Sequence, residues 1–204
     1  MKMPPLRLQH WLIFAAVALL FFSWGVWLMR GMGPAEPWPG FDELRTEVLA
    51  PLADDRLSLE QLHERLGGEL WMQPRPEGPR LLFRGAWPID DGESWLLEAE
   101  LALGQAERTS LAGVFGVVGQ QAEEPLGEQM LAQLSRHQII SLTLRPEQDE
   151  APAARLASSI GQPRLRLELA EGQAWVYPEL GLTAHLRDEQ LRLLQVVPRE
   201  ALKR

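Results

Sequence analysis

LHERLG at Leu62–Gly67 and LASSIG at Leu156–Gly161 align without a gap when the chain is shifted by 94 residues. Each stretch is typical of the last turns of an amphipathic helix, closed by a glycine. The same shift superposes turn and strand residues further along: Glu77-Gly78 on Glu171-Gly172, and Leu81–Phe83 on Trp175–Tyr177. Because the match fixes loop lengths as well as apolar faces, we predict an internal repeat. Chance similarity of two leucine-rich amphipathic patterns is the alternative.

A second helix precedes each of these stretches. Residues 44–52 match residues 126–134 at a shift of 82, with leucine at both ends of each segment. The difference between the two shifts corresponds to the strand-like run Gln138–Arg145 and its turn. We therefore predict an α+β fold with two tandem units, residues 41–121 and 122–204, each made of two helices followed by an antiparallel sheet.

The individual elements are predicted from hydrophobic periodicity and turn residues. Helices are expected at Phe41–Leu52, from a capping box of Ser58 and Gln61, at Pro125–His137 and at Ala153–Ile160. Strands are expected at Glu69–Gln73, Arg80–Trp87, Ser94–Leu103, Gln138–Arg145, Arg164–Leu169, Ala174–Tyr177, Leu182–Arg187 and Leu191–Val197. Glycines recur every third residue in Thr109–Gln121. Close backbone packing or a twisted strand is favoured there over a phosphate-binding loop, because the P-loop lysine is missing.

The second predicted unit resembles a known protein family. LASSIGQP at Leu156–Pro163 is followed by AWVYPELGL at Ala174–Leu182. A helix ending in LG-x-P and then a W-x-Y strand is similar to the SmpA/OmlA (BamE-like) family of outer-membrane-assembly lipoproteins. Two such units in tandem resemble beta-lactamase inhibitor protein. The chain departs from the family at Ile160, where leucine is usual, and it has no cysteine to carry a lipid. The resemblance implies a binding module without catalysis and names no partner.

The stretch Trp11–Met29, WLIFAAVALLFFSWGVWLM, contains nineteen residues without a formal charge. A helix of this length is about 28 Å long, close to the ~30 Å thickness of the bilayer hydrocarbon. We predict a transmembrane helix over residues 11–29, with Trp11, Trp24 and Trp27 as anchors at the headgroup level. A cleavable signal peptide is the alternative, although no A-x-A-like site follows the stretch.

The flanking residues predict an orientation for this helix. Lys2 and Arg7 precede it, so the positive-inside rule predicts a cytoplasmic N-terminus over residues 1–10. Residues 30–40 contain three glycines and three prolines and are predicted to be a short linker. Together these features predict a signal anchor in a bacterial inner membrane, with a periplasmic C-terminal domain.

The charge of the chain after Arg30 limits the classes of partner. All 28 acidic residues follow Arg30, together with 17 of the 20 lysines and arginines, which gives this part a net charge of −11. Because nucleic-acid binding requires a basic surface, we expect no nucleic-acid partner. A protein partner with a basic face, or a cation, is compatible with this charge. The favoured alternative is an acidic surface that only keeps the domain soluble.

The sequence offers little catalytic chemistry. It has no cysteine, no G-x-S-x-G elbow, and no H-x-x-x-H pair among its histidines. The carboxylates Asp90, Asp91 and Glu93 lie in one turn, where neighbours are not held opposite each other across a cleft. We therefore predict no catalytic residue, no cofactor, no metal and no enzymatic activity. A carboxylate-dependent hydrolase and loose cation binding at this turn are the less favoured alternatives.

A partner-binding site is predicted at two aromatic turns. Exposed tryptophan and tyrosine often anchor protein interfaces, whereas tryptophan at strand ends often packs in the core. The predicted contact residues are Trp87, Asp90, Asp91, Trp95, Tyr177, Glu179 and Leu180. The favoured function is a membrane-anchored protein-interaction module, a component or assembly factor of an envelope complex. The alternative is an anchored inhibitor or immunity protein that blocks a toxin or an enzyme.

Overall fold

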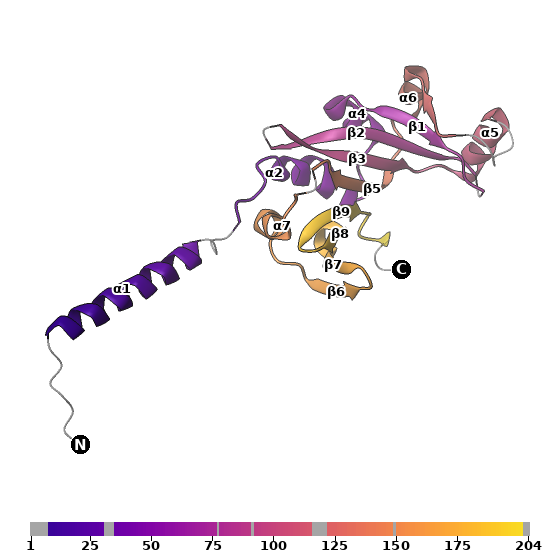
Figure 1. Cartoon of the computed structure of the whole chain (residues 1–204). Helices are drawn as coiled ribbons and strands as arrows, with labels where there is room; N and C mark the ends of the chain where they lie inside the picture. Colours follow the sequence, from indigo (N-terminus) through magenta and orange to yellow (C-terminus); the bar gives the residue numbers. More distant parts are fainter. Residues whose placement is uncertain are drawn as a thin grey trace. The chain divides into compact units, whose positions relative to one another are not determined.

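The computed structural model describes residues 8–30, 35–76, 78–90, 92–115, 122–148 and 150–201. These residues divide into two compact units, Met1–Ala35 and Glu36–Arg204, which we describe separately. The first unit contains helix α1 (Leu8–Arg30), and the second contains all of the strands (Figure 1).

Helix α1 carries large apolar side chains that are exposed: Trp11, Phe14, Val17, Leu19, Leu20, Phe21, Phe22, Trp24 and Val26. Within the described residues, no helix has the length and apolar character needed to cross a membrane.

This finding corrects several predictions made from the apolar stretch. The transmembrane helix over residues 11–29, the signal anchor, and the inner-membrane location with a periplasmic domain are not supported. The predicted membrane anchors Trp11 and Trp24 are exposed side chains of α1, and the side chain of Trp27 lies outside the described residues.

The second unit is built on one antiparallel sheet, which has nine strands in the described part of the chain (Figure 1). The strand order is β4-β1-β2-β3-β5-β9-β8-β7-β6, so β4 and β6 form the two edges. The strands are β1 (Glu69–Gln73), β2 (Arg80–Asp90), β3 (Glu93–Leu101), β4 (Glu124–Leu126), β5 (Ile139–Pro146), β6 (Leu165–Leu169), β7 (Gly172–Tyr177), β8 (Leu182–Arg187) and β9 (Gln190–Val196).

The pairing of β5 with β9 corrects the predicted fold of a membrane helix and two tandem sheets. Leu142, Thr143 and Leu144 of β5 lie opposite residues 194–196 of β9. Since β5 also pairs with β3, and β9 with β8, the strands of both halves form one continuous sheet.

The helices of this unit lie between and after the strands in sequence. They are α2 (Phe41–Leu44), the π-helical turn η1 (Arg45–Leu49), α3 (Ala50–Ala53), α4 (Leu59–Leu66), α5 (Gln105–Phe115), α6 (Glu128–Leu134), α7 (Ala153–Ile160) and the 3-10 turn η2 (Pro178–Leu180). Pro51 explains the wider turn η1, because it has no N–H and its ring would clash with the carbonyl of Glu47 in an α-helix.

Several boundaries are those expected from local signals. Ser58 and Gln61 form both hydrogen bonds of the predicted capping box at the start of α4. The stretch Thr109–Gln121 differs from its prediction, because α5 continues through it as far as Phe115. Residues 116–121, which include two of the three glycines, lie outside the described residues.

The two halves of the sheet follow the same path. Helices α4 and α7 begin 94 residues apart, and their leucines Leu62 and Leu156 are 1% and 0% exposed. The turns after β1 and β6 both use a glycine with positive φ, 114° at Gly78 and 122° at Gly172. Read from opposite ends, the sheet repeats the orders β1-β2-β3-β5 and β6-β7-β8-β9. The division into two units at residues 121 and 122 remains a prediction.

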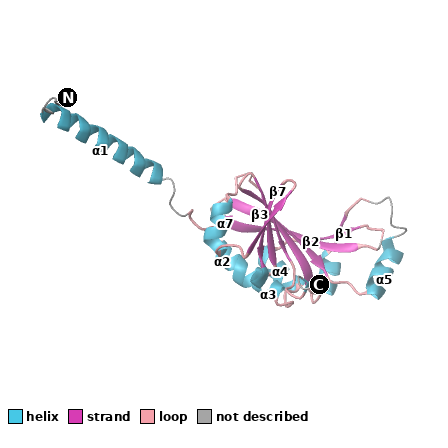
Figure 2. Cartoon of the chain, turned by 90° about the horizontal axis from the view of Figure 1, so that it is seen from below, coloured by secondary structure: helices cyan, strands magenta, loops and turns pink. Residues whose placement is uncertain are grey.

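The helices cover one face of the sheet. Figure 2 shows α2, α3, α4 and α7 on the same side of the strands, and α4, α3 and α7 contact β2, β5 and β9 respectively. In β3, the side chains of Trp95, Leu97, Ala99 and Leu101 are at most 2% exposed, whereas that of Leu96 is 50% exposed. This alternation shows that the other face of β3 has no such layer in the described structure. We call it the uncovered face.

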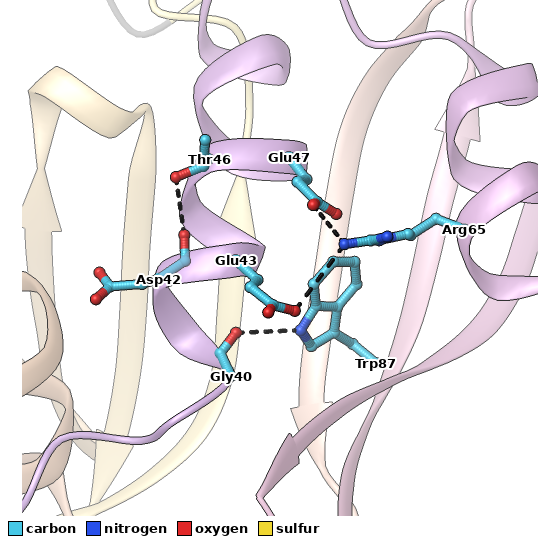
Figure 3. A network of polar contacts seen from close by, with 7 residues as sticks. All are labelled: Gly40, Asp42, Glu43, Thr46, Glu47, Arg65 and Trp87. Atoms are coloured by element: carbon cyan, nitrogen blue, oxygen red, sulfur yellow. Dashed lines mark hydrogen bonds and ion pairs between the residues drawn. The ribbon is translucent and has the colours of Figure 1, made fainter.

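The start of the unit is held against β2 by a small polar network (Figure 3). The amide of Gly40 donates to the carbonyl of Ile89 at 2.8 Å, and its own carbonyl accepts from Nε1 of Trp87 at 3.4 Å. Arg65 of α4 pairs with Glu47 and lies 4.0 Å from a carboxylate oxygen of Glu43. These contacts connect the first helical segment to α4 and to the sheet.

We expect the second unit to unfold in one transition, because the shared sheet couples its halves. Leu62→Ala and Leu156→Ala should each lower the free energy of unfolding by about 2–5 kcal/mol, since each empties a fully buried site. Urea denaturation, followed by tryptophan fluorescence and far-UV circular dichroism, measures both values. Two separate transitions, each shifted by only one of the variants, would contradict this coupling.

Gly40→Ala should destabilise the unit by about 1–3 kcal/mol. A Cβ atom at this position would lie 2.7 Å from the carbonyl oxygen of Pro88 and 3.0 Å from that of Ile89, so the backbone would have to shift. Gly113→Ala is the matched control, because a Cβ there meets no atom within 4 Å and alanine favours the helix. The same denaturation assay compares them, and equal stability of the two variants would argue against this tight contact.

Candidate protein-binding face

The tryptophans of the predicted binding turn are core residues. Trp87 and Trp95 are each 2% exposed and lie on the helix-covered face. The ring of Trp95 packs edge-on against Trp38, with centroids 5.0 Å apart. A partner at the surface therefore has no access to either ring, and the core-packing alternative describes their position.

The carboxylate of Asp90 holds α7 against the end of β2. It accepts a hydrogen bond of 3.0 Å from Arg155, whose guanidinium also lies over Trp38, 5.2 Å from the ring centroid. Asp91 lies outside the described residues. Among the residues that the structure describes, no three His, Asp or Glu side chains gather as metal ligands.

The second predicted turn also makes internal contacts. Tyr177 is 6% exposed, and its hydroxyl donates to the carbonyl of Gly161 at 3.2 Å. The carboxylate of Glu179 pairs with Arg164 at 2.8 Å, and Leu180 packs against the core. This turn joins β7 to β8, and strands β5 and β9 lie between β8 and β3 in the sheet, so the structure does not bring the two groups together.

A hollow of about 200 Å³ lies instead on the uncovered face, across β2, β3 and β5. It is lined by Arg84, Gly85, Leu96, Leu97, Glu98, Thr143 and Arg145. Gly85 and Leu97 belong to the opposite face by strand alternation, so their backbone forms the floor. The side chains of the other residues form the walls.

One wall of the hollow is held rigidly by Arg84. Its Nε donates to Glu98 at 2.9 Å, its Nη1 lies 2.7 Å from Glu123, and its guanidinium is 5.2 Å from the centroid of the Trp71 ring. Hydrogen bonding to Glu123, and then to Glu98, raises the pKa of Arg84. The same bond from Arg84, followed by one from Gln73, lowers the pKa of Glu123. These contacts fix the guanidinium in place.

The opposite wall presents an apolar and a cationic side chain together. Leu96 of β3 is 50% exposed and lies directly opposite Arg145 of β5. The side chain of Arg145 is exposed and makes no hydrogen bond or ion pair with any residue in the described structure. The hollow therefore places an exposed apolar side chain next to an exposed cationic one.

The hollow was not predicted from the sequence, although strand alternation indicates the position of one of its residues, Leu96. In SWLLEAEL, residues 94–101, the buried positions are every second residue from Trp95, which directs Leu96 to the other face. The position of Arg145 next to Leu96 depends on the pairing of β3 with β5, which joins segments about 50 residues apart. No local pattern specifies that pairing.

Comparison of the chain with known protein families, with curated proteins and with solved structures finds no match. The resemblance to the SmpA/OmlA family therefore remains a prediction.

Tyr177, the single tyrosine of the chain, should titrate at unusually high pH. Burial raises its pKa from 10.0 to about 12. Because the unfolded chain releases this proton first, the contribution to stability is complete below pH 10 and is lost as the pH rises towards about 12. Tyrosinate absorbance, measured for the native and the urea-unfolded chain, tests the shift, and Tyr177→Phe provides the blank. Native titration near pH 10 would show that the hydroxyl is not buried.

Proposed function

We propose that residues 36–201 form a non-catalytic protein-binding module that engages a partner protein through the uncovered face. The observation that supports this function is the one-sided structure of the sheet. Its helical layer buries a core on one face, while the other face keeps a half-exposed leucine and an unpaired arginine beside a hollow. An apolar patch rimmed by charged groups is typical of a protein interface.

The chemistry of this face favours a protein over a small molecule. The hollow of about 200 Å³ is smaller than the ~300–1,000 Å³ of usual ligand pockets. Its charged groups alternate in sign, because Arg84 and Arg145 flank Glu98. Such an arrangement suits a partner that presents an apolar side chain between a carboxylate and a basic group.

The charge of the chain supports the absence of a nucleic-acid partner. The segment after Arg30 has a net charge of −11, which repels a phosphate backbone. The two arginines of the hollow do not reverse this balance, since Arg84 is already paired with two glutamates. A partner with a mixed or basic surface fits better.

Single substitutions at the hollow should weaken binding without unfolding the module. The chain is immobilised and used to capture partners from extracts of its source cells, and the captured protein is then purified for affinity measurement. Leu96→Glu and Arg145→Glu should each lower the affinity about tenfold or more, because they remove contacts at the centre of the face. Circular dichroism confirms that each variant is folded.

Arg136→Glu is the matched control for Arg145→Glu. Arg136 is also exposed, but it lies in the turn after α6, away from the strands that line the hollow. Equal loss of affinity in both arginine variants, or no loss in either variant of the hollow, would overturn the proposed face. Inhibition of the partner's own activity on binding would identify the module as an inhibitor, and unchanged activity as a scaffold.

A further inference from the structure

The two edges of the sheet are protected to different degrees. The edge strand β4 has three residues, one of which is Pro125, and this proline cannot donate a hydrogen bond to an added strand. The edge strand β6, LRLEL at Leu165–Leu169, has five residues, contains no proline or glycine, and is exposed at every position. Among the described strands, β6 pairs with β7 alone. Natural edge strands of this kind are usually shielded against further pairing.

The side chains of β6 divide into an apolar row and a charged row. Leu165, Leu167 and Leu169, which are 50%, 44% and 46% exposed, lie on the uncovered face. Arg166 and Glu168 lie on the other face. Arg166 is 4.5 Å from the centroid of the Trp175 ring, and Glu168 accepts a hydrogen bond from Gln173 at 3.0 Å.

The order of these residues is complementary to itself in an antiparallel pair. When two copies of LRLEL meet about a two-fold axis at Leu167, Arg166 of each copy lies opposite Glu168 of the other. Leu167 then meets Leu167, and Leu165 meets Leu169. An axis at Arg166 or at Glu168 would place like charges opposite each other, and parallel in-register pairing would do the same. The charges therefore select one register.

We infer that β6 pairs with β6 of a second copy of this chain, antiparallel about Leu167, so that two sheets join into one. The pairing satisfies the backbone groups of both exposed edges and buries the two leucine rows against each other. A two-fold axis perpendicular to the sheet keeps both uncovered faces on the same side. This dimer goes beyond the proposed partner binding and does not depend on it.

Disulfide cross-linking tests the register, because the natural chain has no cysteine. In full-length Leu167→Cys the two thiols would lie on directly opposed residues, about 4.5–5.5 Å apart between Cα atoms, which allows a disulfide. In Leu165→Cys the like positions would be about 13 Å apart along the strands. Mild oxidation should therefore cross-link the first variant, spare the second, and cross-link an equimolar mixture of Leu165→Cys and Leu169→Cys.

Sedimentation of the full-length chain at a series of concentrations tests the energetics. Leu167→Lys should give a monomer, because two ammonium groups would meet on the axis. Leu96→Lys makes the same change at an exposed leucine of a central strand and should leave the dimer intact. Arg166→Glu should also dissociate the dimer, and the double variant Arg166→Glu/Glu168→Arg should restore it, since the opposite charges are exchanged.

Three results would overturn the dimer. The first is a natural chain that remains monomeric up to about 0.1 mM. The second is a Leu167→Lys protein that still dimerises, which would assign association to another part of the chain. The third is cross-linking that is equal at positions 165 and 167. Thermal unfolding within a few degrees of the natural chain shows that each variant is folded, so loss of the dimer reports on the β6 contact itself.

Discussion

The pairing of β5 with β9 is the interaction on which the rest of this fold depends. It joins a five-stranded part, β4-β1-β2-β3-β5, to a four-stranded part, β9-β8-β7-β6, each of which would otherwise expose an open edge at this point. The leucines at its centre, Leu142, Leu144 and Leu194, are completely buried. Backbone hydrogen bonds and buried side chains both stabilise this pairing, because the leucines of β5 and β9 lie between the sheet and the helices. The core is therefore shared between the halves, and the helices need cover only one side of a single sheet.

Because helices cover only one face of the sheet, the two faces differ in which side chains are buried. On the covered side, large aromatic rings such as Trp87, Trp95 and Tyr177 fill the space between helices and strands. Polar groups such as Asp90 and Arg155 pair on this side as well and hold α7 against β2. The opposite side has a mixed surface, in which Leu96 is half exposed and Arg84 pairs with Glu98. The proposed protein binding is based on this surface.

Elements with strong local signals could be predicted from the sequence. Their pairing in the sheet and the direction of their side chains could not. Helix α4 and strand β1 have the expected boundaries, because a capping box and consecutive glycines mark them. The apolar stretch before the linker suggested a membrane span that the structure does not support. Edge strand β4 was missed, since three residues around a proline give no periodic pattern. The tryptophans beside a turn could have faced either way, and only the complete sheet decides that they point inward.

The order of strands along the chain differs from their order in the sheet, and this has a consequence for biosynthesis. Among the described strands, β9 is the last in sequence, yet it lies between β5 and β8 within the sheet. Both flanks of the sheet are therefore synthesised before β9, the strand that joins them. Until β9 has been synthesised, β5 and β8 each have one unpaired edge in the nascent chain. Such an edge can pair with the wrong strand or be bound by a chaperone.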